Sequence, residues 1–214
     1  MTGYWEERFA HEGMIWGGAA SPTASLAVGL FRSAGVRSVL VPGAGYGRNT
    51  KALSEFFDVT GIELSGSAVR LGQQWDPKTR FVCGSALDPA VIPDNSYDAV
   101  YCYDLLHLFL APQRRELAEV CLEKTRPGGM LFFTAFSDRD PNNGRGRCLE
   151  AGTYEYKPDK YAHFFSEEEL AGYWGESSLA DQGELLETLN AGGKDEHQYL
   201  LRYAAVRKPE KPIR

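Results

Sequence analysis

Three glycines spaced two residues apart follow a short apolar run in the first quarter of the chain. The run is Val39-Leu40-Val41-Pro42, and Gly43, Gly45 and Gly47 come directly after it. Glycine lets a backbone approach a ligand closely, and open parallel sheets bind ligands beyond the carboxyl end of the first strand. The segment therefore predicts a loop that holds a nucleotide-like ligand.

An acid follows this loop at a distance that suits ribose recognition. Glu63 lies twenty residues past Gly43, at the end of the second predicted strand, and its two oxygens can accept hydrogen bonds from two ribose hydroxyls. A dinucleotide-binding fingerprint would space the glycines as G-x-G-x-x-G, whereas here the third glycine comes one residue early. The alternative interpretation is a tight glycine turn beside a surface carboxylate, but strand, loop, helix and acid in this order favour a binding site.

The elements that would position this site alternate between short apolar runs and helical patterns. Apolar strands separated by helices indicate an α/β fold with a doubly wound, mostly parallel sheet covered on both faces. Alternating runs at 184–189 and 198–206, joined through Gly192-Gly193, predict a C-terminal antiparallel hairpin and bring the sheet to seven strands. The other predicted strands are 38–41, 59–62, 81–83, 98–102 and 130–134, and the predicted helices are 24–33, 49–57, 68–75 and 113–124.

Composition and charge exclude several classes of protein. The 214 residues suit a single domain, and the net charge of -6, with nine acidic residues against one lysine in 166–196, argues against a nucleic-acid partner. The sequence shows no secretion signal and no apolar stretch of membrane-spanning length, so we expect a cytoplasmic protein without a membrane partner. The four cysteines form no C-x-x-C pair, which predicts no metal site, and we interpret them as core residues.

At this point the sequence resembles the class I S-adenosylmethionine-dependent methyltransferases. Their first loop has the G-x-G-x-G spacing and their second strand ends in an acid. Tyr4-Trp5-Glu6-Glu7-Arg8 and Trp16-Gly17, followed by Leu40-Val41-Pro42-Gly43-Ala44-Gly45, look most like the thiopurine and tellurite-resistance branches, which act on small molecules. Val82-Cys83-Gly84-Ser85-Ala86-Leu87-Asp88 occupies the place of the adenine-contacting segment, and Arg126-Pro127-Gly128-Gly129 matches the entry to the fifth strand.

The resemblance implies a Rossmann-like methyltransferase fold with S-adenosylmethionine as cofactor and S-adenosylhomocysteine as product. It divides the single domain 1–214 into an N-terminal lid and helix (1–35), a cofactor-binding core (36–136), an insertion near the acceptor site (137–165) and a C-terminal helix and hairpin (166–208). Val41 stands where many relatives have an acid, so the backbone carbonyls of Gly43 and Cys102 are expected to hold the amino group of the cofactor. The implied cofactor contacts are Trp16, Gly43, Ala44, Gly45, Glu63, Leu64, Ser85, Ala86, Cys102 and Tyr103.

Candidate catalytic and substrate residues lie at the edges of this core. His107 follows the fourth strand and His163 follows the insertion, and either imidazole can remove a proton from an acceptor near neutral pH; packing is the alternative role for both. Tyr4, Trp5 and Trp16 can fold over the cofactor as aromatic walls, and the alternative is that they staple the N-terminus onto the core. Arg147 can clamp a carboxylate or oxyanion of the acceptor, although such arginines often only solvate a loop.

The sequence thus predicts a methyltransferase that acts on a small-molecule nucleophile, with a thiol or another soft atom as the favoured acceptor, in a monomer or weak homodimer. A nicotinamide-dependent oxidoreductase is disfavoured by the glycine spacing. A non-catalytic S-adenosylmethionine-binding sensor or scaffold is the alternative from another class. An open acceptor pocket beside the cofactor site would discriminate an enzyme from such a module.

Overall fold

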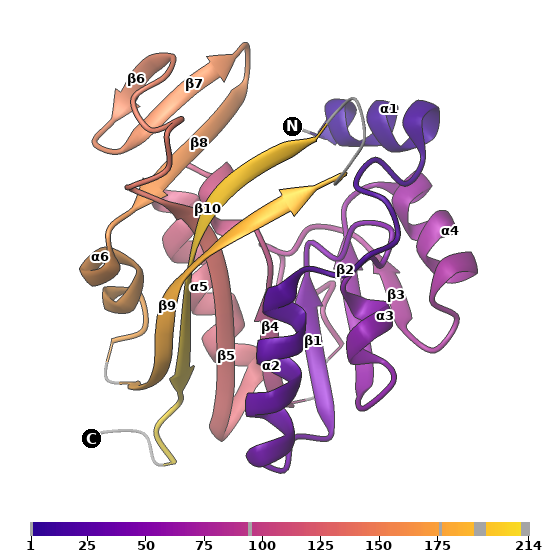
Figure 1. Cartoon of the computed structure of the whole chain (residues 1–214). Coiled ribbons are helices and arrows are strands. Elements are labelled where there is room, and N and C mark those ends of the chain that lie inside the picture. The colour runs from indigo at the N-terminus through magenta and orange to yellow at the C-terminus, as the bar shows by residue number, and fades with distance from the viewer. Residues whose placement is uncertain (1, 94–95, 176, 191–195, 211–214) are drawn as a thin grey trace.

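The computed structural model of the chain describes residues 2–93, 96–175, 177–190 and 196–210. Figure 1 shows a twisted sheet with helices on both faces. The helices are α1 (Thr2–Glu12), α2 (Pro22–Ser33), α3 (Thr50–Leu53), α4 (Gly66–Trp75), α5 (Ala111–Lys124) and α6 (Glu167–Gly172), with a 3-10 turn η1 at Leu106–Leu108. The strands are β1 (Ser38–Pro42), β2 (Asp58–Glu63), β3 (Arg80–Cys83), β4 (Tyr97–Cys102), β5 (Thr125–Ser137), β6 (Arg147–Glu150), β7 (Thr153–Lys157), β8 (Lys160–Phe165), β9 (Ser178–Leu189) and β10 (His197–Arg207).

The main sheet has the strand order β3-β2-β1-β4-β5-β10-β9. The first five of these strands are parallel, β10 is antiparallel to β5, and β9 pairs with β10 as an antiparallel hairpin. The predicted doubly wound sheet with a C-terminal hairpin is therefore confirmed, although the predicted Gly192-Gly193 connection lies outside the described residues. The strands are added outward in one direction from β1 to β3 and in the other direction from β4 to β5. Sheets of this kind bind ligands at the switch point between β1 and β4.

Burial on both faces explains why the parallel strands are apolar throughout. Val39 and Val41 pack with α2 and α3 on one side of the sheet, whereas Leu40 packs with α5 and α6 on the other. Neighbouring residues of one strand point to opposite faces, so each position of β1 lies in a core. The two cores fix the orientation of β1 and of the loop that follows it.

The helix predicted over 49–57 is much shorter in the structure, where only Thr50–Leu53 is helical. The Ser54 hydroxyl donates to the carbonyl of Lys51 at 3.2 Å and to the carboxylate of Asp76 at 2.8 Å. Such side-chain bonds compete with the helical backbone, and the chain turns directly into β2. The other predicted elements agree with the structure apart from their ends, and the largest shifts are that β9 already begins at Ser178 and β5 at Thr125.

The insertion at 137–165 folds into a three-stranded antiparallel meander of β6, β7 and β8. Phe164 and Phe165 of β8 pair in parallel with Phe136 and Ser137, at the carboxyl end of β5. The meander thereby extends the sheet to ten strands within the described part of the chain. In Figure 1 it stands at the same end of the sheet as α1.

Cys102 and Cys121 are buried as expected, but Cys83 and Cys148 are exposed. The core interpretation is wrong for the latter two because β3 is an edge strand and β6 is the outer strand of the meander. Among the described residues, no three His, Cys, Asp or Glu side chains gather in a way that would hold a metal ion. In those same ranges, none of the helices combines the length and the apolar character that a membrane span requires.

Candidate functional site

The loop after β1 bends through three glycines with left-handed backbone. Gly43, Gly45 and Gly47 have φ angles of 68°, 56° and 86°, which side chains other than glycine rarely adopt. A Cβ on Gly43 would lie only 3.0 Å from the side chain of Leu105. The loop borders a cavity of about 750 Å³, within the usual range of small-ligand sites.

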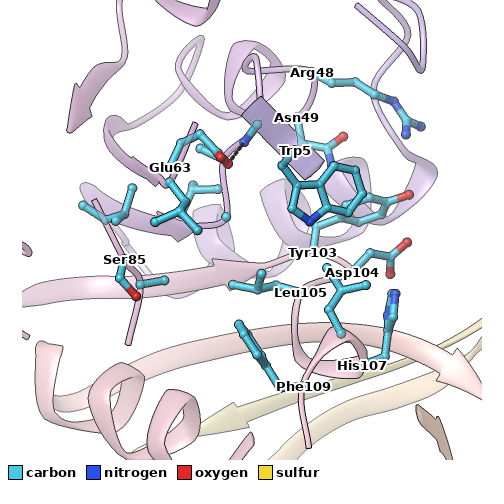
Figure 2. A pocket seen from close by; sticks show the side chains of 18 of the residues that line it. Trp5, Arg48, Asn49, Glu63, Ser85, Tyr103, Asp104, Leu105, His107 and Phe109 are labelled. Carbon is cyan, nitrogen blue, oxygen red and sulfur yellow. Dashed lines mark hydrogen bonds between the residues drawn. The ribbon is translucent and has the colours of Figure 1, made fainter. Parts of the chain in front are cut away.

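Glu63 is fixed at the edge of this cavity by backbone donors. Its side chain accepts hydrogen bonds from the amide of Gly45 at 2.9 Å and from the amide of Ser65 at 2.8 Å. Burial raises the pKa of Glu63, and the backbone donors oppose that rise. Figure 2 shows the Glu63 carboxylate beside the glycine loop, with the bond to Gly45 drawn as a dashed line. Each oxygen keeps a lone pair for a ligand hydroxyl.

Nine of the ten predicted cofactor residues line the cavity. Cys102 is the exception, because its side chain is fully buried in the core. The hydroxyl oxygen of Ser85 accepts a hydrogen bond from the backbone amide of Leu87 at 3.2 Å. A glycine cradle, a fixed acid and a neutral small-residue wall together fit a nucleoside-bearing cofactor. The nine lining residues are Trp16, Gly43, Ala44, Gly45, Glu63, Leu64, Ser85, Ala86 and Tyr103.

Aromatic side chains from the N-terminus form one wall of the cavity. Trp5 projects from α1 into the space opposite Glu63 (Figure 2). Its ring lies 5.9 Å from that of Trp16, and Trp16 stacks on Tyr46 at 6.1 Å. The Tyr46 hydroxyl donates to the carbonyl of Gly17 at 2.7 Å and accepts from the amide of Trp16 at 3.1 Å. The N-terminal segment is therefore packed against the loop that follows β1.

Glu6 attaches α1 to the start of α4. Its carboxylate accepts from the hydroxyl of Ser65 at 2.7 Å, and from the amide and hydroxyl of Ser67 at 3.1 and 2.6 Å. These bonds lower the pKa of Glu6 to about 2. An ionised carboxylate also suits a helix N-terminus, where free amides point outward. Ser65 also donates its amide to Glu63. One residue therefore contacts both α1, which we call the roof of the cavity, and the acid beside the glycine loop, which we call the cofactor wall.

Asp104 lies on the opposite wall, just past the end of β4. Its φ of 48° is left-handed, and Thr134 of β5 holds it twice. The Thr134 hydroxyl donates to Oδ1 at 2.7 Å, and the Asp104 amide donates to the same hydroxyl oxygen at 3.0 Å. Burial, reinforced by the charge of Glu187, raises the pKa of Asp104 to about 7. A carboxyl with this pKa exchanges its proton near neutral pH.

His107 lines the cavity close to this acid but has a different electrostatic character. It is 3% exposed and its ring stacks on Phe136 with 3.9 Å between centroids. Burial lowers the pKa of His107 to about 3, so the imidazole is neutral at physiological pH and is a weak base. Its Nδ1 has no hydrogen-bond partner among the described residues.

Only one of the other predicted catalytic and substrate residues lines the cavity. Trp5 lines it, but His163, Arg147 and Tyr4 do not. The buried His163 ring forms hydrogen bonds with Thr153 of β7 at 2.6 Å and with Glu169 of α6 at 2.8 Å. Arg147 is exposed and pairs with Glu155 at 2.6 Å. Tyr4 lies under the ammonium group of Lys160, 3.1 Å from its ring centroid.

The sequence analysis missed several lining residues. Arg48 follows the glycine loop and forms a buried ion pair with Glu187 of β9 at 2.5 Å; its position beside Gly47 was a usable signal. Asp104 lies between the predicted Tyr103 and His107, and an acid at the end of a predicted strand was a second signal. Tyr199 of β10 gave none, because only the tertiary fold brings the hairpin to the cavity. The missed lining residues include Arg8, Arg48, Asn49, Asp104, Leu105, Phe109, Phe136, Tyr156 and Tyr199.

Comparison with known sequences identifies the core of the chain. A family model described as a methyltransferase domain matches residues 40–133. A tRNA N(3)-methylcytidine methyltransferase of Drosophila melanogaster is 27% identical over 161 residues, covering 68% of this chain and 50% of its own length. The chain spans about half or less of the length of the curated relatives it matches.

Solved structures extend the likeness to nearly the whole chain. A structure from work on the conversion of a disulfide bond into a thioacetal group during echinomycin biosynthesis superposes with a TM-score of 0.74 at 21% identity, covering 99% of this chain and 94% of that chain. The 1,6-didemethyltoxoflavin-N1-methyltransferase of Burkholderia thailandensis, with bound S-adenosylhomocysteine, gives 0.70 at 21% identity, covering 97% and 87%. Residues 40–133 therefore match a methyltransferase domain, and the whole chain has the Rossmann-like fold of these methyltransferase structures.

Proposed function

We propose that the protein transfers a methyl group from S-adenosylmethionine to a small-molecule nucleophile. The observation that carries this proposal is that one cavity has both walls a transfer reaction requires. Gly43 to Gly45 and Glu63 line one side, and Tyr103, Asp104 and His107 line the other, with Trp5 between them. A sensor or scaffold needs the first wall alone, whereas an enzyme needs space for an acceptor beside the cofactor.

Each wall has a separate task in this proposal. When bound, S-adenosylmethionine supplies an electrophilic methyl group. Glu63 binds the ribose hydroxyls, the backbone of Gly43 to Gly45 accommodates the methionine portion, and Ser85 and Ala86 border the adenine. Trp5 and Trp16 exclude water and orient the acceptor. Alignment and desolvation account for most of the rate enhancement in such a displacement.

A small acceptor suits the cavity and the charge of the chain. The cavity of about 750 Å³ is partly covered by α1, and the net charge is -6, which opposes a polyanionic partner. The toxoflavin methyltransferase with a similar fold acts on a small molecule, whereas the Drosophila relative acts on tRNA. The enclosed aromatic wall favours the first kind of acceptor. The segments at 1–16 and 137–165 would then shape the acceptor side.

The test is calorimetric titration of the protein with S-adenosylmethionine and S-adenosylhomocysteine, with NAD as a control ligand. For both sulfur ligands we expect dissociation constants in the micromolar range, which correspond to a binding free energy of about -8 kcal/mol. We expect no binding of NAD. Failure of both sulfur ligands to bind would refute the proposal. Equal binding of all three would indicate a general nucleotide site. Transfer is then followed by release of S-adenosylhomocysteine in the presence of candidate acceptors.

A further inference from the structure

One buried polar atom on the acceptor wall, Nδ1 of His107, has no hydrogen-bond partner in the described part of the chain. The hydroxyl of Tyr103 is buried beside it and interacts with the carboxyl of Asp104 and with Arg48. A buried polar group without a hydrogen bond destabilises a protein by about 1–3 kcal/mol, so such groups are usually explained by function. Both side chains line the same cavity, and Figure 2 shows the His107 ring directed toward Asp104.

The carboxyl of Asp104 comes from the loop between these two residues and is held rigidly. Thr134 bonds both its Oδ1 and its amide, which fixes a residue whose φ of 48° is uncommon outside glycine. Strained backbone of this kind persists where the surroundings enforce it and concentrates at functional sites. The three polar groups therefore form one preorganised cluster on the acceptor wall.

Flat apolar walls surround this cluster. Phe136 stacks on His107 at 3.9 Å and on Tyr199 at 5.1 Å. Trp5 and Phe109 face the same space in Figure 2. Aromatic surfaces of this kind favour an aromatic acceptor, because ring–ring contacts add to the burial of apolar area.

Charge restricts the acceptor further. The two arginines that line the cavity, Arg8 and Arg48, are already paired with Glu12 at 3.3 Å and Glu187 at 2.5 Å. An anionic acceptor would therefore find no unpaired arginine among the described lining residues. An aliphatic ammonium, with an ordinary pKa of about 10, would keep its proton beside a carboxyl of pKa about 7. Neither charged class fits the cluster.

We propose that Asp104 is the general base of the transfer and that Tyr103 and His107 help it bind an uncharged aromatic acceptor through an N–H, O–H or S–H group. This inference rests on the proposed methyltransferase function and names the acceptor class for the same site. The acceptor ring lies between the aromatic walls. Its reacting heteroatom points from Asp104 toward the cofactor side of the cavity.

The step balances without any further reactant. The acceptor heteroatom forms a bond to the methyl carbon while the carbon–sulfur bond breaks and its electron pair stays on sulfur. The electron pair of the N–H, O–H or S–H bond stays on the heteroatom, and its proton moves to the Asp104 carboxylate. The protonated carboxyl then loses this proton to water before the next cycle. The neutral His107 and the Tyr103 hydroxyl hold the acceptor and are not consumed.

The acceptor class is tested with three matched phenols and the full chain in the presence of S-adenosylmethionine. Phenol is uncharged near neutral pH, 4-hydroxybenzoate adds a carboxylate, and 4-(aminomethyl)phenol adds an ammonium. We expect kcat/KM to be at least about tenfold higher for phenol than for either charged phenol, a difference of about 1.4 kcal/mol. Equal or faster turnover of a charged phenol, or no turnover of phenol by protein that binds S-adenosylhomocysteine, would overturn the inference. Absence of S-adenosylhomocysteine binding would instead refute the proposed function.

The base is tested with Asp104→Asn, using Asp181→Asn on β9 as the matched control outside the cavity. With phenol, which keeps its proton near neutral pH, kcat should fall by about 10²–10⁴-fold. With thiophenol at mildly alkaline pH, where the thiol is already ionised, the fall should be less than about tenfold because no base is needed. Equal losses for both acceptors would show that Asp104 is structural, and unchanged kcat for phenol would exclude it as the base. Asp104→Glu should restore part of the phenol activity.

The pH profile gives an independent readout. The acidic limb of kcat/KM for phenol should disappear in Asp104→Asn and remain in Asp181→Asn; persistence of the limb in both variants would overturn the assignment. Titratable and charged groups from four elements around the cavity interact electrostatically with Asp104. They are Arg48, Tyr101, Cys102, Tyr103, Glu187 and Tyr199.

Discussion

The two walls of the cavity are built in different ways. The cofactor wall consists of backbone and one acid from a single stretch, from Gly43 to Ala86. The acceptor wall consists of side chains from α1, from the loop after β4, from β5 and from the C-terminal hairpin, with Trp5 and Tyr199 at its extremes. Backbone recognition needs only local glycine geometry, whereas side-chain recognition needs the whole tertiary fold.

The acids on the two walls lie in different electrostatic environments. Glu63 receives two backbone hydrogen bonds from neighbouring loops, and it acts as a fixed acceptor. Asp104 accepts a hydrogen bond from the Thr134 hydroxyl. Burial and the nearby negative charge of Glu187 raise its pKa to about 7. The same side-chain chemistry is thus set for binding on one wall and for proton exchange on the other.

The largest expected effect comes from the ion pair that joins the walls. In Glu187→Ala, the buried guanidinium of Arg48 loses its counter-charge, and we expect the free energy of unfolding to fall by about 3–5 kcal/mol. Urea denaturation measures it. The control is Glu55→Ala, which removes an exposed pair with Lys78 and should change stability by less than about 1 kcal/mol. Similar losses in both variants would mean that the two walls are not joined through this pair.

The next effect should be confined to the cofactor wall. Glu63→Ala removes the acceptor of the Gly45 and Ser65 amides and of the ribose hydroxyls, so S-adenosylhomocysteine should bind more weakly by about 1–3 kcal/mol. Calorimetry measures the affinity, with the exposed Glu123→Ala on α5 as control. An unchanged affinity would remove the acid from the cofactor wall.

The pH dependence should separate the walls further. Because Asp104 must be ionised to act as a base and its pKa is raised to about 7, transfer should increase as the pH rises through 7. Stability should change in the opposite direction, since a carboxyl with a raised folded pKa stabilises fully below its ordinary pKa of 3.8 and loses that contribution as the pH rises through 7. Asp104→Asn should therefore gain stability relative to wild type as the pH rises from about 4 to about 7. A constant difference in unfolding midpoint across this window would contradict the raised pKa.

The smallest effect is expected at the roof. Glu6→Gln weakens the attachment of α1 to Ser65 and Ser67, because an amide cannot match the two-oxygen acceptor. Amide exchange should become faster across α1 while β1 and β4 stay protected, and Trp5 fluorescence should shift toward that of exposed indole. The control is Glu7→Gln, whose side chain is exposed on the same helix. Identical exchange in both variants would show that the aromatic packing alone holds α1.

Local signals explain why the cofactor wall could be predicted from sequence. The glycine spacing at 43–47 and the acid at Glu63 lie next to strands whose burial on both faces makes them apolar, so pattern and chemistry coincide. The hairpin was equally visible from its alternation. The helix at 49–57 failed because the Ser54 hydroxyl bonds Asp76, a long-range contact that no local pattern shows.

The acceptor wall was predicted only in part, for a physical reason. His107 was correctly expected to lie on the ligand side of the sheet, but its expected basicity depended on exposure, and the stacking of Phe136 buries it. His163 and Arg147 were expected near an acceptor, yet the insertion folds into a meander. There His163 bonds Thr153 and Glu169 of the neighbouring α6, and Arg147 pairs with Glu155. Exposure and partners of single polar residues follow from packing, and sequence patterns do not encode them directly.

The left-handed backbone of Asp104 sets folding against function at one position. Replacement by glycine would relieve a conformation that is unfavourable for residues with a Cβ and would remove a buried acid, and both changes favour the folded state. Selection for thermal robustness alone should therefore enrich glycine at position 104, while selection for turnover should retain aspartate there. In a library of substitutions at position 104, selection for stability should enrich glycine over aspartate, and selection for turnover should enrich aspartate over glycine.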